Sequence, residues 1–512
     1  MAEELKASKE FKGFDRRKLL VFCVFFALTM LLFDTHLGTN SPYTYGYPVV
    51  YKQWPAAVEG LATNWDAPLN VPMAEFFYGS QPSLSEQPAT FSLASLPIPS
   101  FMTSIFMGFT RSYTLASYMA NITVLLLLFL VFINFAASLG TSYLAMGVAG
   151  SMILLLPFLA QYVGQPMHYI TGTAVNFLIL IGLMSLSHRG YKNAWGLGLL
   201  TGIFLLNYDP YVFFMAAILY FVFVDRLEKK RHYLYFLVAA AAPVLAWTLF
   251  VQLIKPPGAT NQNYNSFIKP TIKGWLDYFK HPVKEFSLPF HAFQVGLTVA
   301  FREIIAYIYW PILIFVCYYL FKFRNSIKGS KLFKFLYLLM GVFLIEMFVT
   351  SVFDFEKNTR RALPMLFVFA FFLTFVVAKT IGRGKVKYLI AVLLVMAFVL
   401  TFADVFVKDP SIQATQYGEY IRGEPNAIMK IYEERLNDLK TIPYGQTLSM
   451  LFTQKRVDSG KLNLGRFVFS QLFLFLVLLA LFFLLYKGAL LPWYSVVIFT
   501  GVYMASMVVR FI

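Results

Sequence analysis

The sequence predicts an all-α integral membrane protein with about 13 transmembrane helices and a long first external loop that contains interfacial helices. Three observations lead to this fold class. The first is composition, because 58% of the 512 residues are hydrophobic and only 13% are charged. Soluble domains average about 45–50% apolar and 25% charged residues. The second observation is a series of apolar runs, and the third is an uneven distribution of basic residues between these runs.

The apolar runs are spaced along most of the chain. A helix that crosses the hydrocarbon core needs roughly 20 apolar residues, and several runs are shorter, among them the adjacent pair at 194–208 and 210–224. Helical spans are expected at 19–33, 115–137, 141–162, 168–187, 194–208, 210–224, 233–254, 304–321, 333–352, 364–378, 388–407, 467–486 and 490–511.

Lysine and arginine gather in alternate connections between these runs. They are frequent in the N-terminal tail and recur in every second connection up to Lys487, except in the tight turn near Gly140. Cytoplasmic connections favour Lys and Arg. We therefore expect a multi-pass protein of the inner or plasma membrane, with a cytoplasmic N-terminus and an external C-terminus. This placement also explains the net charge of +17 without a nucleic-acid partner.

The expected topology divides the chain into four parts. The parts are a cytoplasmic tail (1–18), a transmembrane core (19–407), an external loop (408–466) and two C-terminal transmembrane helices (467–512). The transmembrane core contains two long external loops, 34–114 and 255–302.

The first external loop opens with a carboxylate, Asp34, directly after the first span. Loops beyond about 15 residues are usually functional, so this placement indicates a reaction centre at the outer membrane surface. Prolines divide the loop into shorter pieces. One of them, Phe101–Thr110, is expected to form an interfacial helix with Phe101, Ile105 and Phe106 facing lipid.

A basic cluster precedes the apolar run at 364–378. Lys357, Arg360 and Arg361 would lie on the external side, where positive charge is normally avoided. Guanidinium groups bind phosphate through two parallel hydrogen bonds, so the cluster is a candidate phosphate site. Alternatively, these side chains reach toward lipid headgroups or pair with Asp354 and Glu356.

Other polar residues are candidates for a substrate cavity. Asp209 is the only charge in an apolar hairpin, although with Pro210 it could form a simple turn. Neither HxxxH nor HExxH spacing occurs, nor a P-loop, so neither a metal nor a cofactor is expected. The cavity candidates are His36, Asp66, His168, Asp209, Glu303, Asp354 and Glu356.

The layout over most of residues 1–407 resembles the polytopic GT-C glycosyltransferases, the group with protein O-mannosyltransferases and lipid A aminoarabinose transferases. Phe33-Asp34 stands where that family places its catalytic carboxylate. The stretch from Asn358 to Pro364 looks like the family's late Arg-Tyr-x-x-Pro segment near the donor phosphate, with Ala362 where an aromatic is common. A tandem acidic pair, a DxD motif and a WWD-type signature are missing, which argues against asparagine-linked oligosaccharyl transfer.

The resemblance implies transfer of a sugar from a polyprenyl-phosphate donor to an acceptor on the outer, periplasmic or extracellular face. It implies that Asp34 is the general base and that Arg360, Arg361 and Lys357 hold the donor phosphate. Inversion at the anomeric carbon would follow, with little or no dependence on metal. The expected partners are the donor and the bilayer, while the acceptor and any membrane partner subunit stay open.

Two alternatives belong to other classes. A secondary transporter or flippase for a lipid-linked or polar substrate would use Glu346, Asp209 and Glu303 as coupling acids. A scaffold subunit of an envelope assembly would use the loops 255–302 and 408–466 as docking surfaces.

Overall fold

The computed structural model describes residues 15–36, 97–110, 113–156, 159, 168–207, 210–254, 309–354, 363–406 and 464–511. Within these ranges the chain is helical and has no strand, which confirms the all-α class. Every apolar run expected above coincides with at least part of a helix. The longer helices are α1 (Arg16–His36), α5 (Tyr113–Ser138), α8 (His168–His188), α11 (Lys230–Ile254), α17 (Lys331–Asp354), α18 (Leu363–Thr380), α19 (Val386–Phe406), α23 (Leu464–Lys487) and α24 (Tyr494–Phe511).

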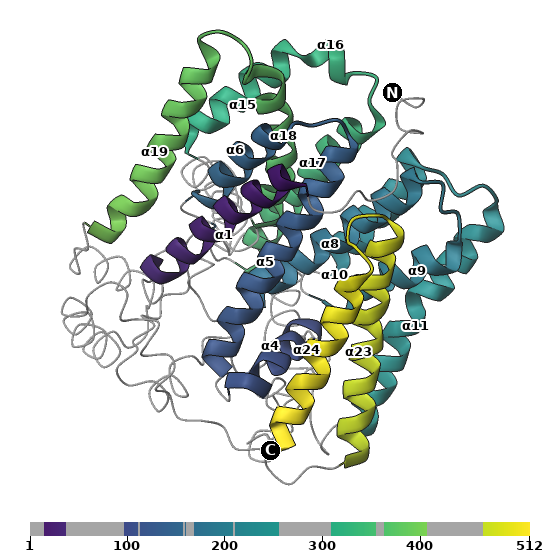
Figure 1. Ribbon diagram of the computed structural model, residues 1–512. Coiled ribbons are helices and arrows are strands. Elements are labelled where there is room, and N and C mark those ends of the chain that lie inside the picture. Colours follow the sequence, from purple (N-terminus) through teal and green to yellow (C-terminus); the bar gives the residue numbers. More distant parts are fainter. Residues whose placement is uncertain are drawn as a thin grey trace, which may run out of the picture.

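Shorter elements complete the bundle in Figure 1. They are α4 (Pro97–Thr110), α6 (Tyr143–Leu154), α9 (Ala194–Gly202), η5 (Ile203–Leu206), α10 (Pro210–Leu219), η6 (Tyr220–Val224), α15 (Trp310–Lys322) and α16 (Arg324–Ile327). Four helices of the described ranges are long and apolar enough to span a membrane. These spans are Ala116–Ser138, Tyr169–His188, Lys230–Phe250 and Leu363–Thr380, and they mark a membrane protein.

A chain of hydrogen bonds joins several helices at one end of the bundle. The Lys18 ammonium donates to the Asn134 carbonyl oxygen (3.2 Å), and the Asn134 amide donates to the backbone carbonyl of Leu490 (2.8 Å). The Ser185 hydroxyl donates to the carbonyl of Gly488 (2.7 Å). The start of α1, the ends of α5 and α8 and the α23–α24 turn therefore meet.

The same end continues through the connection after η6. Asp225 accepts hydrogen bonds from Ser187 at the end of α8 and from Lys192 (2.9 Å). Lys331 at the start of α17 donates to the carbonyl of Val224 (3.4 Å). The basic connections thus lie at one end of the bundle, as their alternation along the sequence predicts.

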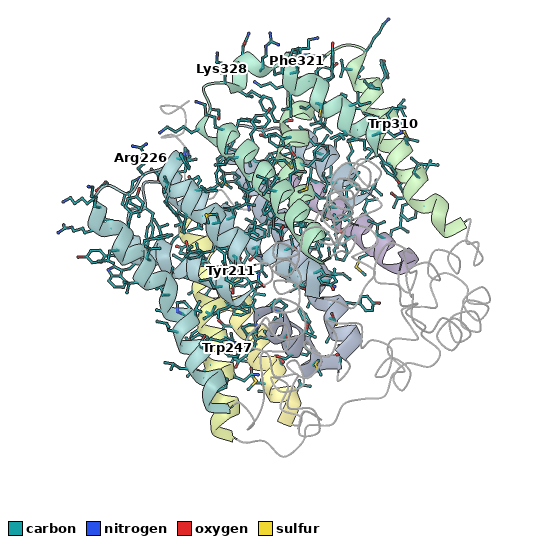
Figure 2. All side chains as sticks on the ribbon, turned by 180° about the vertical axis from the view of Figure 1, so that it is seen from behind. Tyr211, Arg226, Trp247, Trp310, Phe321 and Lys328 are labelled. Carbon is teal, nitrogen blue, oxygen red and sulfur yellow. The ribbon has the colours of Figure 1, made fainter. Side chains whose placement is uncertain are left out.

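We call this the basic end. Figure 2 shows Arg226 and Lys328 at its edge, the upper one in that view. Its basic residues are Arg16, Arg17, Lys18, Arg189, Lys192, Arg226, Lys229, Lys230, Arg231, Lys322, Arg324, Lys328, Lys331, Lys334, Lys379, Arg383, Lys385, Lys387 and Lys487.

Helix α9 packs on α11 through two glycines. A Cβ atom added at Gly198 would lie 2.3 Å from the carbonyl oxygen of Phe236, and one at Gly202 would lie 2.3 Å from that of Ala240. The spacing of four residues puts both glycines on one face of α9. Small residues at this spacing let two membrane helices approach closely. The contact fixes α9 against the first half of α11.

The pair α9/η5 and α10/η6 forms a short hairpin that rises from the basic end. Its first leg is roughly 21 Å long at the usual rises per residue, which is less than the ~30 Å hydrocarbon core. At the tip, the Asn207 amide donates to the carbonyl of Gly172 (2.7 Å) and to Asn176 Oδ1 (2.8 Å) in the first turns of α8. Figure 2 places Tyr211, just past the tip, near mid-height. The Asn207 side chain is fully buried in the bundle.

Helix α4 corrects an expectation. Phe101 and Ile105 were expected to face lipid, but both are buried, and Phe106 is partly buried. The reason is tertiary packing, since α5 and α24 cover this helix. The Ser506 hydroxyl of α24 donates to the carbonyl of Ile105 (2.6 Å), and the rings of Phe101 and Tyr503 lie 6.0 Å apart.

We expect Gly198→Ala and Gly202→Ala each to lower the stability of the protein by about 1–3 kcal/mol, the usual cost of overpacking. The added methyl group would meet a backbone carbonyl, which cannot move aside like a flexible side chain. Thermal unfolding in detergent micelles measures the effect.

The matched controls are Gly341→Ala in α17 and Gly501→Ala in α24. Nothing lies within 4 Å of a Cβ atom at either position, so alanine should be neutral or stabilise by up to about 1 kcal/mol through its helix propensity. Equal melting temperatures for all four variants would contradict the close α9–α11 contact.

Candidate functional site

The structure describes only part of the expected site. Asp34 and His36 belong to the last turn of α1, His168 is the first residue of α8, and Asp354 is the last residue of α17. Their side chains lie outside the described residues. The remaining expected site residues lie outside the described ranges altogether and are Asp66, Asp209, Glu303, Glu356, Lys357, Arg360 and Arg361.

The described helix ends show where the chain leads to these residues. Helix α1 starts at the basic end and finishes with the turn that contains Asp34. Helix α17 starts there with Lys331 and finishes at Asp354, and α18 runs from Leu363 back toward Lys379. The turn with Asp34 and the helix ends on either side of residues 355–362 therefore lie at the ends of these helices that point away from the basic end.

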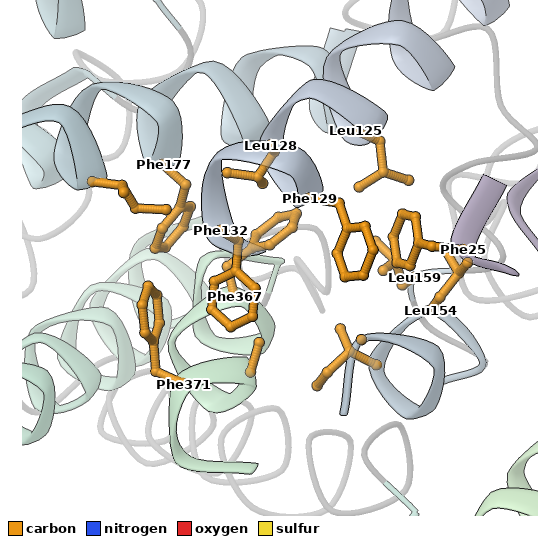
Figure 3. A pocket seen from close by; sticks show the side chains of 14 residues that line it. Phe25, Leu125, Leu128, Phe129, Phe132, Leu154, Leu159, Phe177, Phe367 and Phe371 are labelled. Carbon is orange, nitrogen blue, oxygen red and sulfur yellow. The ribbon is translucent and has the colours of Figure 1, made fainter. Parts of the chain in front are cut away.

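A cavity of about 50 Å³ lies between α1, α5, α6, α8 and α18. Helix α6 packs against both α1 and α18, so that these two helices line the same space. Figure 3 shows the aromatic rings around it. Its walls consist of leucine, isoleucine, alanine and glycine together with Phe25, Phe129, Phe132, Phe177, Phe367 and Phe371.

The geometry of this wall depends on a glycine. The rings of Phe25 and Phe129 stack with centroids 3.6 Å apart. A Cβ atom at Gly150 would lie 2.4 Å from the Phe129 ring. Any larger residue at this position would therefore displace the ring. Cavities lined only by apolar groups stay dry and accept apolar ligands. The chemistry of this cavity suits a hydrocarbon chain.

Polar groups gather at the other end of α8. The carbonyl oxygen of the Asn121 side chain, on α5, accepts from the Thr171 backbone N–H (3.2 Å) and hydroxyl (2.6 Å). The first four N–H groups of a helix have no partner within the helix, so Asn121 satisfies one of them from a neighbouring helix. This bond fixes the start of α8 against α5.

Asn207 adds the tip of the hairpin to this group. Its orientation is determined, because the carbonyl of Gly172 can only accept and therefore must face the amide nitrogen. Asn207 Oδ1 and Thr173 Oγ1 are buried and have no hydrogen-bond partner among the described residues. Leaving a buried polar group without a partner costs about 1–3 kcal/mol.

These residues form the α8 polar cluster, which comprises Asn121, Thr171, Thr173, Asn176 and Asn207. Two residues of the cluster lie one helical turn from residues that line the apolar cavity. Side chains four residues apart lie one above the other on a helix, so Asn121 stands over Leu125, and Thr173 over Phe177. Leu125 and Phe177 both line the cavity.

Sequence reasoning missed this cluster. The available signal was the presence of asparagines inside apolar runs, because an amide in a hydrocarbon environment requires partners. Within the described ranges, three or more His, Cys, Asp or Glu do not gather where they could hold a metal ion. Comparisons of the chain with protein families, with characterised proteins and with solved structures give no match.

We expect Asn207→Asp to destabilise the protein by about 3–5 kcal/mol, the cost of an unpaired buried charge. A carboxylate cannot donate, so it would face the oxygens of Gly172 and Asn176 without a proton between them. Thermal unfolding in micelles at neutral pH measures the loss.

The matched control is Asn193→Asp. Asn193 is exposed and caps α9, where its Oδ1 only accepts, from the backbone N–H groups of Trp195 (3.1 Å) and Gly196 (3.3 Å). Aspartate caps helices as well as asparagine, so this variant should melt like the wild type. A stable Asn207→Asp variant would disprove the donor role of the Asn207 amide.

Proposed function

We propose that this protein is a membrane glycosyltransferase that moves a sugar from a polyprenyl-phosphate donor to an acceptor at the membrane face opposite the basic end. The proposal assigns the basic end to the cytoplasm, since cytoplasmic connections favour Lys and Arg. The C-terminus of α24 then lies on the external face.

The proposal keeps about thirteen apolar segments within the membrane, with one change in how they cross it. We propose that the α9–α10 pair is a re-entrant hairpin, because its short legs meet at a tip whose Asn207 side chain is buried against α8. A hairpin enters and leaves on the same face. Two full crossings would also return the chain to the same face. Treating the pair as a hairpin therefore does not change the membrane side of any other connection.

The observation that carries the proposal is the position of α1 and α18. Both line the apolar cavity. Helix α1 ends with the turn of Asp34, and α18 directly follows the segment of Arg360 and Arg361. A polyprenyl-phosphate donor needs a hydrocarbon-lined space for its chain and charged groups at the membrane surface for its phosphate. The two helices combine both requirements.

The chemistry then follows from the residues. The Asp34 carboxylate accepts the proton of an acceptor hydroxyl or amine as a general base. The acceptor oxygen or nitrogen bonds to the anomeric carbon from the face opposite the phosphate, whose oxygen leaves with the electrons of the broken bond. Configuration inverts. Arg360, Arg361 and Lys357 offset the charge of the departing phosphate.

We expect Asp34→Asn to lower sugar transfer by ~10²–10⁴-fold, the usual contribution of a positioned base. The assay is transfer from a panel of polyprenyl-phosphate sugars with the protein in nanodiscs. Asp15→Asn is the control, because Asp15 is exposed at the opposite end of the same helix. Transfer within about threefold of the wild type would remove Asp34 as the base.

For the donor phosphate, we expect one of Arg360→Ala and Arg361→Ala to weaken donor use by roughly 1.5–3 kcal/mol, the range for a hydrogen bond to a charged group. Consecutive residues would point about 100° apart if this segment is helical, so the other should matter less. Lysine at the sensitive position should restore use only in part, because it lacks the guanidinium fork. Arg324→Ala at the basic end is the control, and donor kinetics decide.

One observation favours a second candidate, a secondary transporter for a polar substrate. Such proteins bind their substrates at interrupted helices inside the membrane, and the tip around Asn207 is an interruption of this kind. One measurement distinguishes the two candidate functions. A transporter would move substrate across proteoliposomes without forming a glycosidic product.

A further inference from the structure

One corner of the basic end combines basic and aromatic residues without any acid. It consists of the last turn of α15, the short helix α16 and the turn between α18 and α19. The stretches that contain these elements, 309–345 and 363–403, have neither Asp nor Glu in their sequence. We call this the acid-free corner, and its exposed basic residues are Lys322, Arg324, Lys328, Lys379, Arg383, Lys385 and Lys387.

The corner around η6 and the start of α11 is different, because its basic residues are accompanied by acids. Asp225 forms an ion pair with Lys192 (2.9 Å), and Glu228 lies three residues further along the chain. Like charges that gather on one surface attract anions. At the acid-free corner the matching negative charge must come from outside these elements.

Two arginines of the acid-free corner lie against aromatic rings. The guanidinium carbon of Arg324 lies 4.4 Å from the ring centroid of Phe321. That of Arg383 lies 4.9 Å from the ring centroid of Phe323, which contacts Phe375 of α18 at 6.2 Å. Neither guanidinium donates a hydrogen bond within the described part of the chain. A ring beside a guanidinium leaves its N–H groups available for phosphate oxygens.

The corner lies at the level of lipid headgroups. Lys379 belongs to the last turn of α18, whose apolar span Leu363–Thr380 is long enough to cross a membrane. Figure 2 shows Phe321 and Lys328 together at the upper edge of the molecule. Phe321 and Tyr318 are exposed on α15, beside the cations. Aromatic rings and cations at the end of a span are typical of the membrane interface.

We propose that the acid-free corner binds the headgroup of an anionic phospholipid, with Arg324 and Arg383 on its phosphate. Clusters of about four to eight Lys and Arg beside a span bind such lipids. A zwitterionic headgroup would bring its own cation into a surface that already has an excess of positive charge. The lipid chain lies along the exposed apolar face of α15, next to Ile314 and Phe321. The proposal does not depend on sugar transfer.

The test uses phosphatidylglycerol and phosphatidylcholine that bear the same diazirine in one acyl chain. The full-length protein in phosphatidylcholine nanodiscs is photolysed with a trace of each probe, and mass spectrometry maps the labelled residues. One Lys or Arg near an anionic headgroup contributes about 1 kcal/mol, which is about fivefold in binding. We therefore expect phosphatidylglycerol to label the exposed face of α15 at least about fivefold more than phosphatidylcholine does.

Arg324→Gln and Arg383→Gln should each lower this labelling by phosphatidylglycerol about fivefold and leave labelling by phosphatidylcholine unchanged. Arg383→Lys keeps the charge, so it should retain more labelling than Arg383→Gln. The matched control is Arg231→Gln, which removes the same charge from an exposed position at the same end, in the corner that contains Asp225 and Glu228. Labelling of α15 should not change in this variant.

Inorganic phosphate tests whether the lipid chain contributes. In excess it should displace the probe no better than sodium chloride at equal ionic strength, because an anion without a chain gains nothing from the apolar face of α15. Displacement by phosphate alone would instead mean a site for a soluble anion and would overturn the lipid site. Equal labelling by the two lipids would also overturn it, as would an equal effect of Arg231→Gln, which would mean diffuse attraction to the whole basic end. None of these outcomes bears on sugar transfer, which Asp34→Asn tests separately.

Discussion

Helices in a hydrocarbon environment gain little by hiding apolar surface from lipid, so this bundle depends on close backbone contact and on polar side chains that bond between helices. The two glycines of α9 bring its backbone against α11. Asn134 ties α1 to the α23–α24 turn, and Asn121 ties α5 to α8. The cavity exists because the arrangement is fixed.

Local pattern determined much of the fold in advance. The apolar runs are helical because a backbone in hydrocarbon must bond to itself, and the basic connections meet at one end because alternate turns of a spanning bundle do. The pattern does not say which polar residues pair. Asn121 and Asn134 lie in the same apolar run, yet one caps α8 and the other joins Lys18 to a carbonyl. That difference is a property of neighbours distant in sequence.

The errors have the same origin. Phe101 and Ile105 form an amphipathic pattern that suits a lipid surface as well as a protein surface, and α24, far along the chain, decides between them. The glycine pair on α9 was readable as a small-residue motif, whereas the partner backbone on α11 was not. For the expected site, the structure adds the helices that lead to Asp34 and to the arginines, and the roles of these residues remain predictions.

The recessed tip of the hairpin has a consequence for biosynthesis. In the proposed re-entrant arrangement, with legs of about 21 Å, the membrane insertion machinery would not release α9 and α10 as two independent spans. The Asn207 amide would also enter hydrocarbon without partners unless α8 were already in place to receive it. In that arrangement the hairpin inserts as one unit after α8, and α11, which follows it in the chain, forms the glycine contact with α9. The order of the chain from α8 to α11 is thus also an order of assembly.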